Sequence, residues 1–346
     1  MLLRVDRLRV QLDASGRPLA VVDDVSLGIE AGQTVALVGE SGCGKTLTAL
    51  AVLRLLPAAT RVAGGRVMFD GRDLLTLPEG ELQGVRGDRI AMIFQEAMTC
   101  LNPVLPIGDQ IAEPLRVHRG LPVRAARRRA VELLRRVGIA DAERRASDHP
   151  HQFSGGMQQR VMIAMSLACE PALLIADEPT TALDVTIQAQ IIALLRDLQQ
   201  QCGLAILFIT HDLPLVAEFA EHVYVMYAGR IVEHAPAARL FASPRHPYTQ
   251  ALLRSVLTLA EGSGFGVQGS GTMSGAAVPA RPRLPVVPGE VPTPARRPSG
   301  CAFHPRCPLG RDDAQCRTQS PPLDPVDASH SCACWKAERT AATAFS

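Results

Sequence analysis

Hydrophobic residues follow two patterns in the first part of the chain. Leu3–Leu12 and Val21–Ile29 alternate apolar and polar residues, and Asp13–Pro18 between them has turn chemistry. This alternation predicts an antiparallel hairpin with one buried face. Leu173–Ala176 and Ala205–Thr210 are instead apolar at every position. Such runs are typical of parallel strands that are covered on both faces of their sheet.

The remaining pattern completes an α/β prediction. Further strands are expected at Thr34–Val38, Gly64–Phe69, Arg89–Gln95, Val223–Tyr227 and Gly229–Val232. Helices are expected at Leu47–Leu56 and Gln158–Ala168, and the pattern is helical and rich in arginine from Glu96 to Ala168. We therefore expect an α/β core with an antiparallel β subdomain and an α-helical subdomain at about residues 96–170.

The composition changes after Pro244. Residues 261–275 are rich in glycine and serine, and Pro279–Pro298 is rich in proline. Neither stretch offers much to bury, which predicts a flexible insertion at about 261–280 followed by extended chain. The expected organisation is one domain over residues 1–245 and a C-terminal extension over 246–346.

Bulk composition narrows the function classes. The chain has 346 residues, 47% of them hydrophobic, and a formal net charge of +2, which argues against a general nucleic-acid binder. No apolar run reaches the roughly 18–20 residues that cross a bilayer, and charged residues come too early for a signal peptide. We expect a cytoplasmic protein whose membrane role, if any, needs partner subunits. Nine cysteines then indicate reduced thiols or metal ligands rather than disulfides.

A glycine-rich loop carries the first candidate chemistry. It follows a predicted strand and opens a predicted helix, and its residues are Gly39, Glu40, Ser41, Gly42, Cys43, Gly44, Lys45 and Thr46. The glycines let backbone N–H groups converge on phosphate oxygens at a helix N-terminus. Lys45 is expected to reach the β- and γ-phosphates of a nucleotide, and Thr46 to place its hydroxyl on Mg²⁺.

Further polar residues follow three other predicted strands. Asp177 and Glu178 end the run that begins at Leu173, Gln95 follows the strand at Arg89, and His211 follows Thr210. Taken alone, the two acids could cap the next helix, Gln95 could be a polar turn, and His211 could be structural. Their order along the chain, with Asp184 between them, favours a shared site.

Ser154, Gly155 and Gly156 form the most informative stretch, because they lie shortly before the acid pair. Ser154 is expected to cap a helix, and the two glycines allow a phosphate to approach closely. The alternative is an ordinary capped helix with no role in nucleotide binding. With the upstream loop and the acid pair, this stretch resembles the Ser-Gly-Gly-Gln signature of the ABC-type ATPases. Met157 stands where that family most often has glutamine, and methionine is common there in the peptide importers.

The resemblance implies a role for each residue. Asp177 would bind Mg²⁺ together with Thr46 and Gln95, and Glu178 would be the general base that polarises the attacking water. Gln95 and His211 would contact the γ-phosphate. Ser154, Gly155 and Gly156 would contact ATP bound to the opposite subunit, so that two ATP molecules join two subunits.

The family usually stacks adenine on an aromatic residue in the first hairpin. Leu12 is the nearest match here, and no aromatic residue precedes Phe69. We therefore expect apolar contact or a differently placed group to hold the adenine.

The tail narrows the resemblance further. His246–Leu253, Pro288–Pro292 and Gly300–Pro308 are similar to the C-terminal extension of the oligopeptide/dipeptide importer ATPases, some of which act in nickel uptake. Asn102-Pro103 and Glu113-Pro114 resemble the segment that touches the membrane subunits of importers. The resemblance covers nearly the whole chain except the glycine- and serine-rich insertion.

The tail also holds a candidate metal site. Cys301, Cys307, Cys316 and Cys334 have the count of a four-thiolate site, and some members of the family carry a [4Fe-4S] cluster on such cysteines. Cys332 is a competing fourth ligand. The spacing lacks a Cys-x-x-Cys pair, which weakens a zinc ribbon. A cluster, a zinc ion and free thiols all stay open from the sequence.

The function that this predicts is an ATPase subunit that powers an importer, most simply for di- and oligopeptides. Its expected partners are a second ATPase subunit, identical or paralogous, two transmembrane permease subunits and an extracytoplasmic peptide-binding protein. It would lie peripherally on the cytoplasmic face of the membrane. A soluble ABC ATPase of translation or repair would show a second core or a coiled-coil insertion, and neither is present. A nucleotide-binding module without turnover would lack Glu178 or His211.

Arginines at positions 124, 127, 128, 129, 135 and 136 share a predicted helix. A solvated helix face is the favoured interpretation over a nucleic-acid patch.

Overall fold

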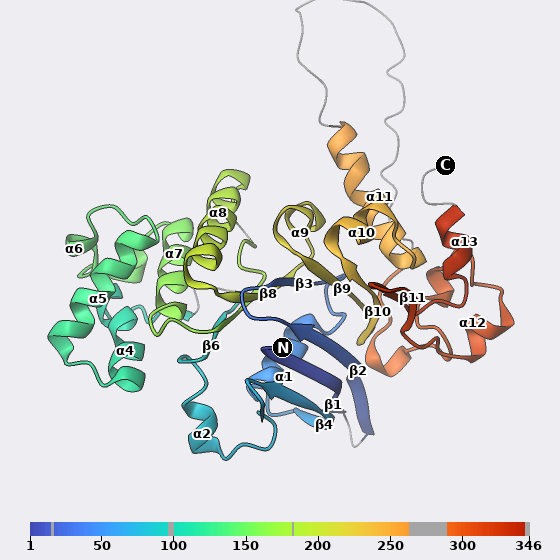
Figure 1. Cartoon of the computed structure of the whole chain (residues 1–346), viewed down its shortest axis with the longest axis horizontal. Coiled ribbons are helices and arrows are strands. Elements are labelled where there is room, and N and C mark those ends of the chain that lie inside the picture. Colours follow the sequence, from blue (N-terminus) through green and yellow to red (C-terminus); the bar gives the residue numbers. More distant parts are fainter. Residues whose placement is uncertain (15–16, 96–99, 182, 263–288, 343–346) are drawn as a thin grey trace, which may run out of the picture.

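The computed structural model describes residues 1–14, 17–95, 100–181, 183–262 and 289–342. Two sheets organise them (Figure 1). The first has the strand order β2-β1-β4-β5 and is antiparallel. Its strands are β1 (Leu3–Ala14), β2 (Arg17–Ile29), β4 (Thr60–Phe69) and β5 (Arg72–Asp73).

The second sheet has the order β11-β12-β10-β9-β3-β8-β7-β6. Five neighbours, from β9 to β6, run parallel, and β10, β12 and β11 add antiparallel pairs. Its strands are β3 (Thr34–Val38), β6 (Ile90–Ile93), β7 (Leu173–Asp177), β8 (Ala205–Thr210), β9 (His222–Tyr227), β10 (Arg230–Pro236), β11 (Asp324–Asp327) and β12 (His330–Cys332).

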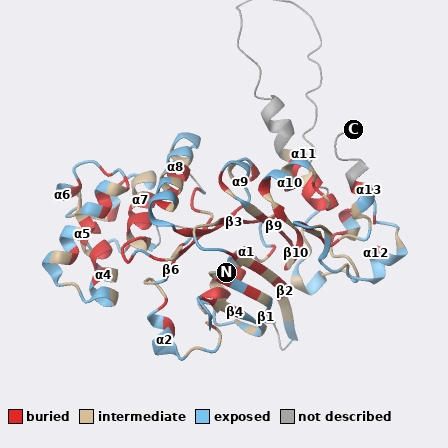
Figure 2. Cartoon of the chain, in the orientation of Figure 1, coloured by how far each residue is buried: buried red, intermediate tan, exposed pale blue. Residues whose placement is uncertain are grey.

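The uniformly apolar strands are buried on both faces, as predicted. Every residue of β3, β7 and β8 is buried. In β8, Leu207 and Ile209 join the hydrophobic core shared with the antiparallel sheet, whereas Ile206 and Phe208 join the core under the helices. Alternate residues of one strand therefore serve two cores, which leaves no position for a polar side chain until the strand ends. Figure 2 shows this buried band through the middle of the molecule.

Helices cover the second sheet and extend beyond it (Figure 1). The described helices before the C-terminal extension are α1 (Lys45–Val52), α2 (Glu79–Gln83), α4 (Ile107–Arg119), α5 (Val123–Arg136), α6 (Ala142–Arg145), α7 (Gly155–Ser166), α8 (Val185–Cys202), α9 (Leu213–Phe219) and α10 (Ala237–Ala242). The helices α4–α7 form the helical subdomain, which lies at the opposite end of the molecule from the C-terminal extension. Within the described part of the chain, no helix is both long and apolar enough to span a membrane.

Both predicted helices differ from the structure at their two ends. The helix after the glycine-rich loop is Lys45–Val52 rather than Leu47–Leu56, and α7 is Gly155–Ser166 rather than Gln158–Ala168. Ser154 caps α7 as predicted. Its hydroxyl accepts a hydrogen bond from the N–H of Met157, and both signature glycines lie in the first turn.

The C-terminal extension consists of α11 (Pro247–Gly262), three-residue helices at Pro294–Arg296 and His304–Arg306, α12 (Ala314–Thr318), β11, β12 and α13 (Ala337–Ala342). It shares the main sheet, because β12 pairs with β10. Beneath this pairing the fully buried Glu233 accepts hydrogen bonds from the N–H of His246 at 3.0 Å and from His330 Nε2 at 2.7 Å. The division at residue 245 remains a prediction. Of the expected insertion, residues 261–262 end α11, and 263–280 lie outside the described residues.

The arginine-rich helix is α5, as predicted. Its side chains meet carboxylates on neighbouring elements: Arg127 pairs with Asp109, and Arg129 pairs with Glu132 and Glu170. These exposed pairs are those of a solvated helix face.

Candidate functional site

The glycine-rich loop takes a backbone shape that its glycines make possible. Gly39 and Gly44 have φ angles of 156° and 113°. A Cβ on Gly39 would lie 2.2 Å from the carbonyl oxygen of Met226, so no other residue fits there. The loop leads directly into α1, whose first N–H groups have no partner inside the helix. This is the geometry that binds phosphate oxygens.

Lys45 is held inside the loop. Its Nζ donates hydrogen bonds to the carbonyl oxygens of Gly39 at 2.8 Å and Glu40 at 3.2 Å, and the residue is 5% exposed. The ammonium group therefore lies among the loop carbonyls, at the centre of the expected phosphate site. Cys43 is buried beneath the loop, and burial raises the pKa of its thiol, so it stays protonated at neutral pH.

Asp177 and Thr46 form the expected metal position. The Thr46 side chain acts to lower the pKa of Asp177, while Asp177 Oδ1 is buried and has no hydrogen-bond partner. Burial raises the pKa of Asp177, and the charge of Glu178 adds to the rise. A buried carboxylate with an unsatisfied oxygen beside a hydroxyl is a site that a bound cation would complete, and Mg²⁺ prefers such oxygen ligands.

Glu178 is the centre of the predicted catalytic group. Its Oε2 accepts hydrogen bonds from Gln95 Nε2 at 2.9 Å and from the Thr181 hydroxyl at 3.0 Å, and its Oε1 lies 3.2 Å from His211 Nδ1. Burial acts to raise the pKa of Glu178, but the hydrogen bonds from His211 and Thr181 outweigh it, so the net pKa is lowered. Glu178 is therefore an ionised carboxylate at neutral pH, as a proton acceptor must be.

Backbone strain helps to aim this side chain. Glu178 has a φ angle of 48°, in the left-handed region that non-glycine residues rarely adopt. Its N–H donates to the carbonyl of Ile209 at 2.9 Å, which fixes the bend at the end of β7. Strain of this kind persists where surrounding contacts hold the residue in place.

The signature residues lie apart from this group. Ser154 caps α7, and a Cβ on Gly156 would lie 2.8 Å from Ile187 of α8. In the described part of the chain, no hydrogen bond or ion pair joins Ser154–Gly156 to the loop at 39–46. One chain thus gathers every predicted phosphate and catalytic residue except the signature.

Sequence reasoning missed three residues that contact this site. Thr181 bonds to Glu178 directly, and Tyr248 and Arg306 of the C-terminal extension bond to Glu40 of the loop. Thr181 was within reach, because it follows Glu178 by three residues. No sequence signal connects position 40 with positions 248 and 306.

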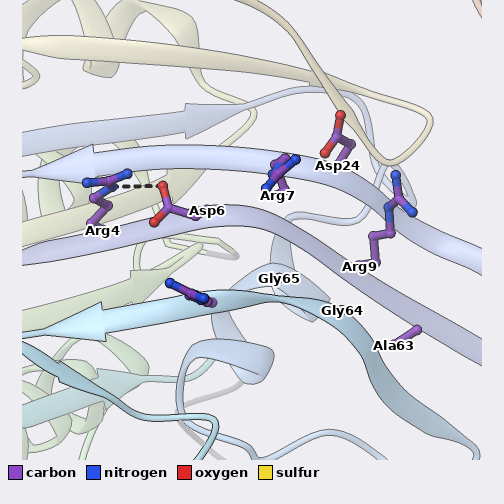
Figure 3. Close-up of a pocket in the computed structure, with 9 residues that line it drawn as sticks. Arg4, Asp6, Arg7, Arg9, Asp24, Ala63, Gly64 and Gly65 are labelled. Carbon is purple, nitrogen blue, oxygen red and sulfur yellow. Dashed lines mark hydrogen bonds and ion pairs between the residues drawn. The ribbon is translucent and has the colours of Figure 1, made fainter.

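A second hollow lies on the antiparallel sheet and is separate from the loop (Figure 3). Four arginines line it together with two acids, and they are Arg4, Arg7, Arg9, Arg66, Asp6 and Asp24. Arg4 pairs with Asp6 at 2.8 Å, and Arg9 lies 3.8 Å from Asp23. None of the residues that line this hollow belongs to the predicted nucleotide site.

The four tail cysteines meet around one cavity. Cys301, Cys307, Cys316 and Cys334 all line it, while Cys332 on β12 does not. A Cβ on Gly310 would lie 3.1 Å from the Cys316 sulfur and 3.4 Å from the Cys307 sulfur. Burial raises the pKa of Cys316 to about 12 and of Cys334 to about 11. Among the described residues, no three His, Cys, Asp or Glu side chains converge closely enough to bind one metal ion.

Comparison with known families agrees with this geometry. Residues 22–181 match the ABC transporter family, and residues 232–274 and 273–316 match the oligopeptide/dipeptide transporter C-terminal region.

Individual relatives match over most of the chain. A Brucella melitensis protein named for peptide import and ATP binding is 48% identical over 347 residues, 99% of this chain and 98% of that one. The Escherichia coli dipeptide transport ATP-binding protein DppD is 47% identical over 323 residues, 93% of each chain.

A solved structure shares the fold as well. The dimeric, post-hydrolysis ATP-binding cassette MJ0796, bound to ADP and phosphate, has a TM-score of 0.62 and 29% identity, over 68% of this chain and 98% of that one. With the loop, the acid pair and the C-terminal region all in place, the chain belongs to the ABC transporter ATPases, in the branch that carries the oligopeptide/dipeptide transporter C-terminal region.

Proposed function

We propose that this chain hydrolyses ATP to drive uptake of di- or oligopeptides through separate permease subunits. The single observation that carries the hydrolytic part is the arrangement around Glu178: an ionised carboxylate held by Gln95, Thr181 and His211, beside a buried Asp177 and the loop with Lys45. The peptide assignment rests on the C-terminal region and on relatives named for peptide and dipeptide transport.

In the proposed mechanism, the loop N–H groups and Lys45 bind the β- and γ-phosphates of ATP. Thr46 and Asp177, with Gln95, would hold Mg²⁺, which neutralises phosphate charge when it is bound. Glu178 accepts a hydrogen bond from the attacking water and takes up its proton as the water oxygen bonds to the γ-phosphorus. The bond from that phosphorus to the bridging oxygen breaks, and ADP and phosphate are the products. His211 and Gln95 keep the carboxylate oriented and contact the γ-phosphate. Positioning and charge stabilisation supply most of the rate.

A second ATPase subunit would complete the site. The signature residues Ser154, Gly155 and Gly156 lie away from the loop of their own chain, so they are placed to meet ATP held by a partner. Val185, which begins α8 close to the signature, is 81% exposed, as expected of a residue that pairing covers. The partner is identical or paralogous, and the dimeric MJ0796 cassette supports pairing of this kind.

The permease contact would lie in an open apolar groove between the core sheet and the helical subdomain. The groove has a volume of about 300 Å³, and Leu55, Phe94, Pro114, Met162 and Met165 are among its lining residues. Leu55 is 40% exposed and Phe94 37%. A helix from the cytoplasmic side of a permease, presenting apolar side chains, fits such a groove, and methionines adapt to its shape.

The segments whose sequence resembles the permease-contacting segment of importers lie in or near this groove. Pro114, in the middle of α4, lines the groove, and the loop at Asn102-Pro103 is fixed by Gln110, whose side chain bonds to the N–H and the carbonyl of Asn102 at 2.9 Å each. Docking there would place the chain peripherally on the cytoplasmic face of the membrane, beneath two permease subunits that receive peptide from an extracytoplasmic binding protein.

The cysteine cavity would hold a [4Fe-4S] cluster. Four thiols line one cavity, and their raised pKa values mean that they stay protonated unless a cation replaces the protons. A zinc ion needs all its ligands around one atom, and no such convergence exists among the described residues. A four-iron cluster takes one thiolate on each iron, so its ligands stand further apart. The four thiols that line the cavity match this count of one thiolate for each iron.

Replacing Glu178 by Gln should lower steady-state ATP hydrolysis by at least about 100-fold, since a positioned base contributes roughly 10²–10⁴-fold. ATP binding should persist, because Gln keeps the shape of the side chain. Phosphate release by the assembled transporter and ATP titration of the purified subunit measure the two effects. Hydrolysis at the wild-type rate would show that Glu178 is not the base.

Replacing Ser154 by Arg should block ATP-driven pairing and leave ATP affinity of the separate subunit within about twofold, because the signature acts across the interface. The measurement is light scattering after gel filtration with ATP, in the Glu178→Gln background that retains bound nucleotide. A dimer that forms normally in Ser154→Arg would contradict the two-subunit site.

Replacing Leu55 by Asp should prevent co-purification with the permease subunits, because a charge would be buried in the apolar groove. ATP binding should be unchanged. Leu323→Asp is the matched control, since Leu323 is 36% exposed on the C-terminal extension and lies outside the groove. Equal recovery of permease with both variants would rule out the groove as the docking site.

Anaerobically purified protein should be brown and contain about four iron and four sulfide per chain. Cys334→Ser should lose the visible absorption, whereas Cys332→Ser should retain it, because of these two cysteines only Cys334 lines the cavity. Absorption spectra with iron and sulfide analysis check both. Stoichiometric zinc without iron, or neither metal in protein made with intact cluster assembly, would refute the cluster.

A further inference from the structure

The C-terminal extension touches the phosphate loop at Glu40. The backbone N–H of Glu40 donates to the hydroxyl of Tyr248 at 2.8 Å. The carboxylate of Glu40 receives two hydrogen bonds from Arg306, at 2.7 Å from Nη1 and 3.0 Å from Nη2. Residues more than 200 positions apart thus meet at the second residue of the loop that is expected to bind ATP.

Arg306 is built into this position. Its side chain is 6% exposed and lies over the rings of Tyr227 and Phe303, at 5.8 and 5.9 Å from their centroids. Tyr248 packs against both rings, so the guanidinium is enclosed by aromatic side chains on one side and by Glu40 on the other. A bidentate arginine–carboxylate pair in such surroundings is directional and strong.

Glu40 also bonds to another residue of the loop. Its carbonyl oxygen accepts a hydrogen bond from Lys45 Nζ at 3.2 Å. A continuous path of hydrogen bonds therefore runs from Arg306 through Glu40 to the lysine that is expected to bind the β- and γ-phosphates. A shift of Glu40 would move the lysine contact and the backbone of the loop together.

The charges of the pair also predict the direction in which loss of Arg306 would change ATP affinity. ATP brings several negative charges to the loop, and an ionised Glu40 beside them would repel the nucleotide. Arg306 neutralises that carboxylate and turns it toward the extension. Removing the arginine alone would leave a partly buried, unpaired carboxylate next to the phosphate site.

The opposite end of the contact lies beside the cysteine cavity. Arg306 immediately precedes Cys307, and the backbone around it is fixed by hydrogen bonds from the N–H of Cys301 to the carbonyl of Cys316 and from the N–H of His304 to the carbonyl of Cys301. Any rearrangement of the cysteine cavity therefore acts on the backbone that carries Arg306.

We propose that Arg306 is a positioning residue for nucleotide binding, which holds the phosphate loop through Glu40 and makes ATP affinity depend on the state of the C-terminal extension. The proposal rests on ATP binding at the loop and does not depend on which metal, if any, the cysteines bind. The extension is then a regulatory element for the nucleotide site as well as a structural part of the fold.

The first experiment is a double-mutant cycle on the full-length chain. Arg306→Gln should weaken binding of a fluorescent ATP analogue by at least about fivefold, the lower range of measured coupling between sites. Adding Glu40→Gln should recover part of that loss, because the unpaired charge is gone while the contact that positions the loop is still absent. If Arg306 only stabilised the extension, Glu40→Gln would not recover any ATP affinity. A double variant that binds ATP as weakly as Arg306→Gln would therefore overturn the proposal.

Two further variants serve as controls for this result. Arg306→Lys keeps a cation over Glu40 but cannot donate two parallel bonds, so it should fold and bind ATP with an affinity between wild type and Arg306→Gln. Arg239→Ala breaks another pair between core and extension, with Asp327, that involves no loop residue. It should leave ATP affinity unchanged. Wild-type affinity in both Arg306 variants, or an equal loss in Arg239→Ala, would refute the assignment.

Kinetics and hydrogen exchange separate positioning from catalysis. In the assembled transporter, Arg306→Gln should raise the KM for ATP with kcat within about twofold, since Glu178 and its partners are untouched. Because coupling is reciprocal, ATP should slow amide exchange of residues 301–307 in the wild-type chain but not in the double variant. A fall in kcat at constant KM, or exchange at 301–307 that ignores ATP, would contradict the proposal. If the wild-type chain itself did not bind ATP, that result would instead refute the proposed function.

Discussion

The burial of the central parallel strands on both faces is the constraint on which the site depends. Because β3, β7 and β8 expose neither face, polar residues can stand only where the strands end. The parallel register then brings those ends together: Val38 pairs with Thr210, and Asp177 pairs with Ile209. The phosphate loop, the acid pair and His211 follow at one edge of the sheet, where ligands of open α/β sheets bind.

Within that edge, Glu178 is the proposed base, and its neighbours set its charge. Burial alone would raise its pKa, but the hydrogen bonds from His211 and Thr181 lower it. Asp177, one residue earlier, is shifted in the opposite direction and keeps an unsatisfied oxygen. Two adjacent carboxylates thus have different environments, one suited to a metal ion and the other to a proton, which is the separation that an acid–base site requires.

The C-terminal extension belongs to the same physical unit as the nucleotide site. It lengthens the main sheet through β12, buries His330 against Glu233 and meets the loop through Tyr248 and Arg306. The separation into a core and an appended tail that composition suggests is therefore less complete in three dimensions. Contacts from the extension reach the loop at Glu40, one residue beyond the glycine that begins it.

The sequence by itself determined the parallel strands, the hairpins, the glycine-rich loop and the ordered set Gln95, Asp177, Glu178 and His211, because local periodicity and short spacings encode them. It placed the start of α7 three residues too late, although it identified Ser154 as the cap, because glycine is a poor helix former and the pattern therefore suggested a later start. It also chose Cys334 over Cys332 as the fourth cysteine, and Cys334 lines the cysteine cavity. Only the tertiary structure decided that Tyr248 and Arg306 bind Glu40. Those contacts join residues far apart in the chain, and their partners are selected by packing and desolvation, which no local pattern records.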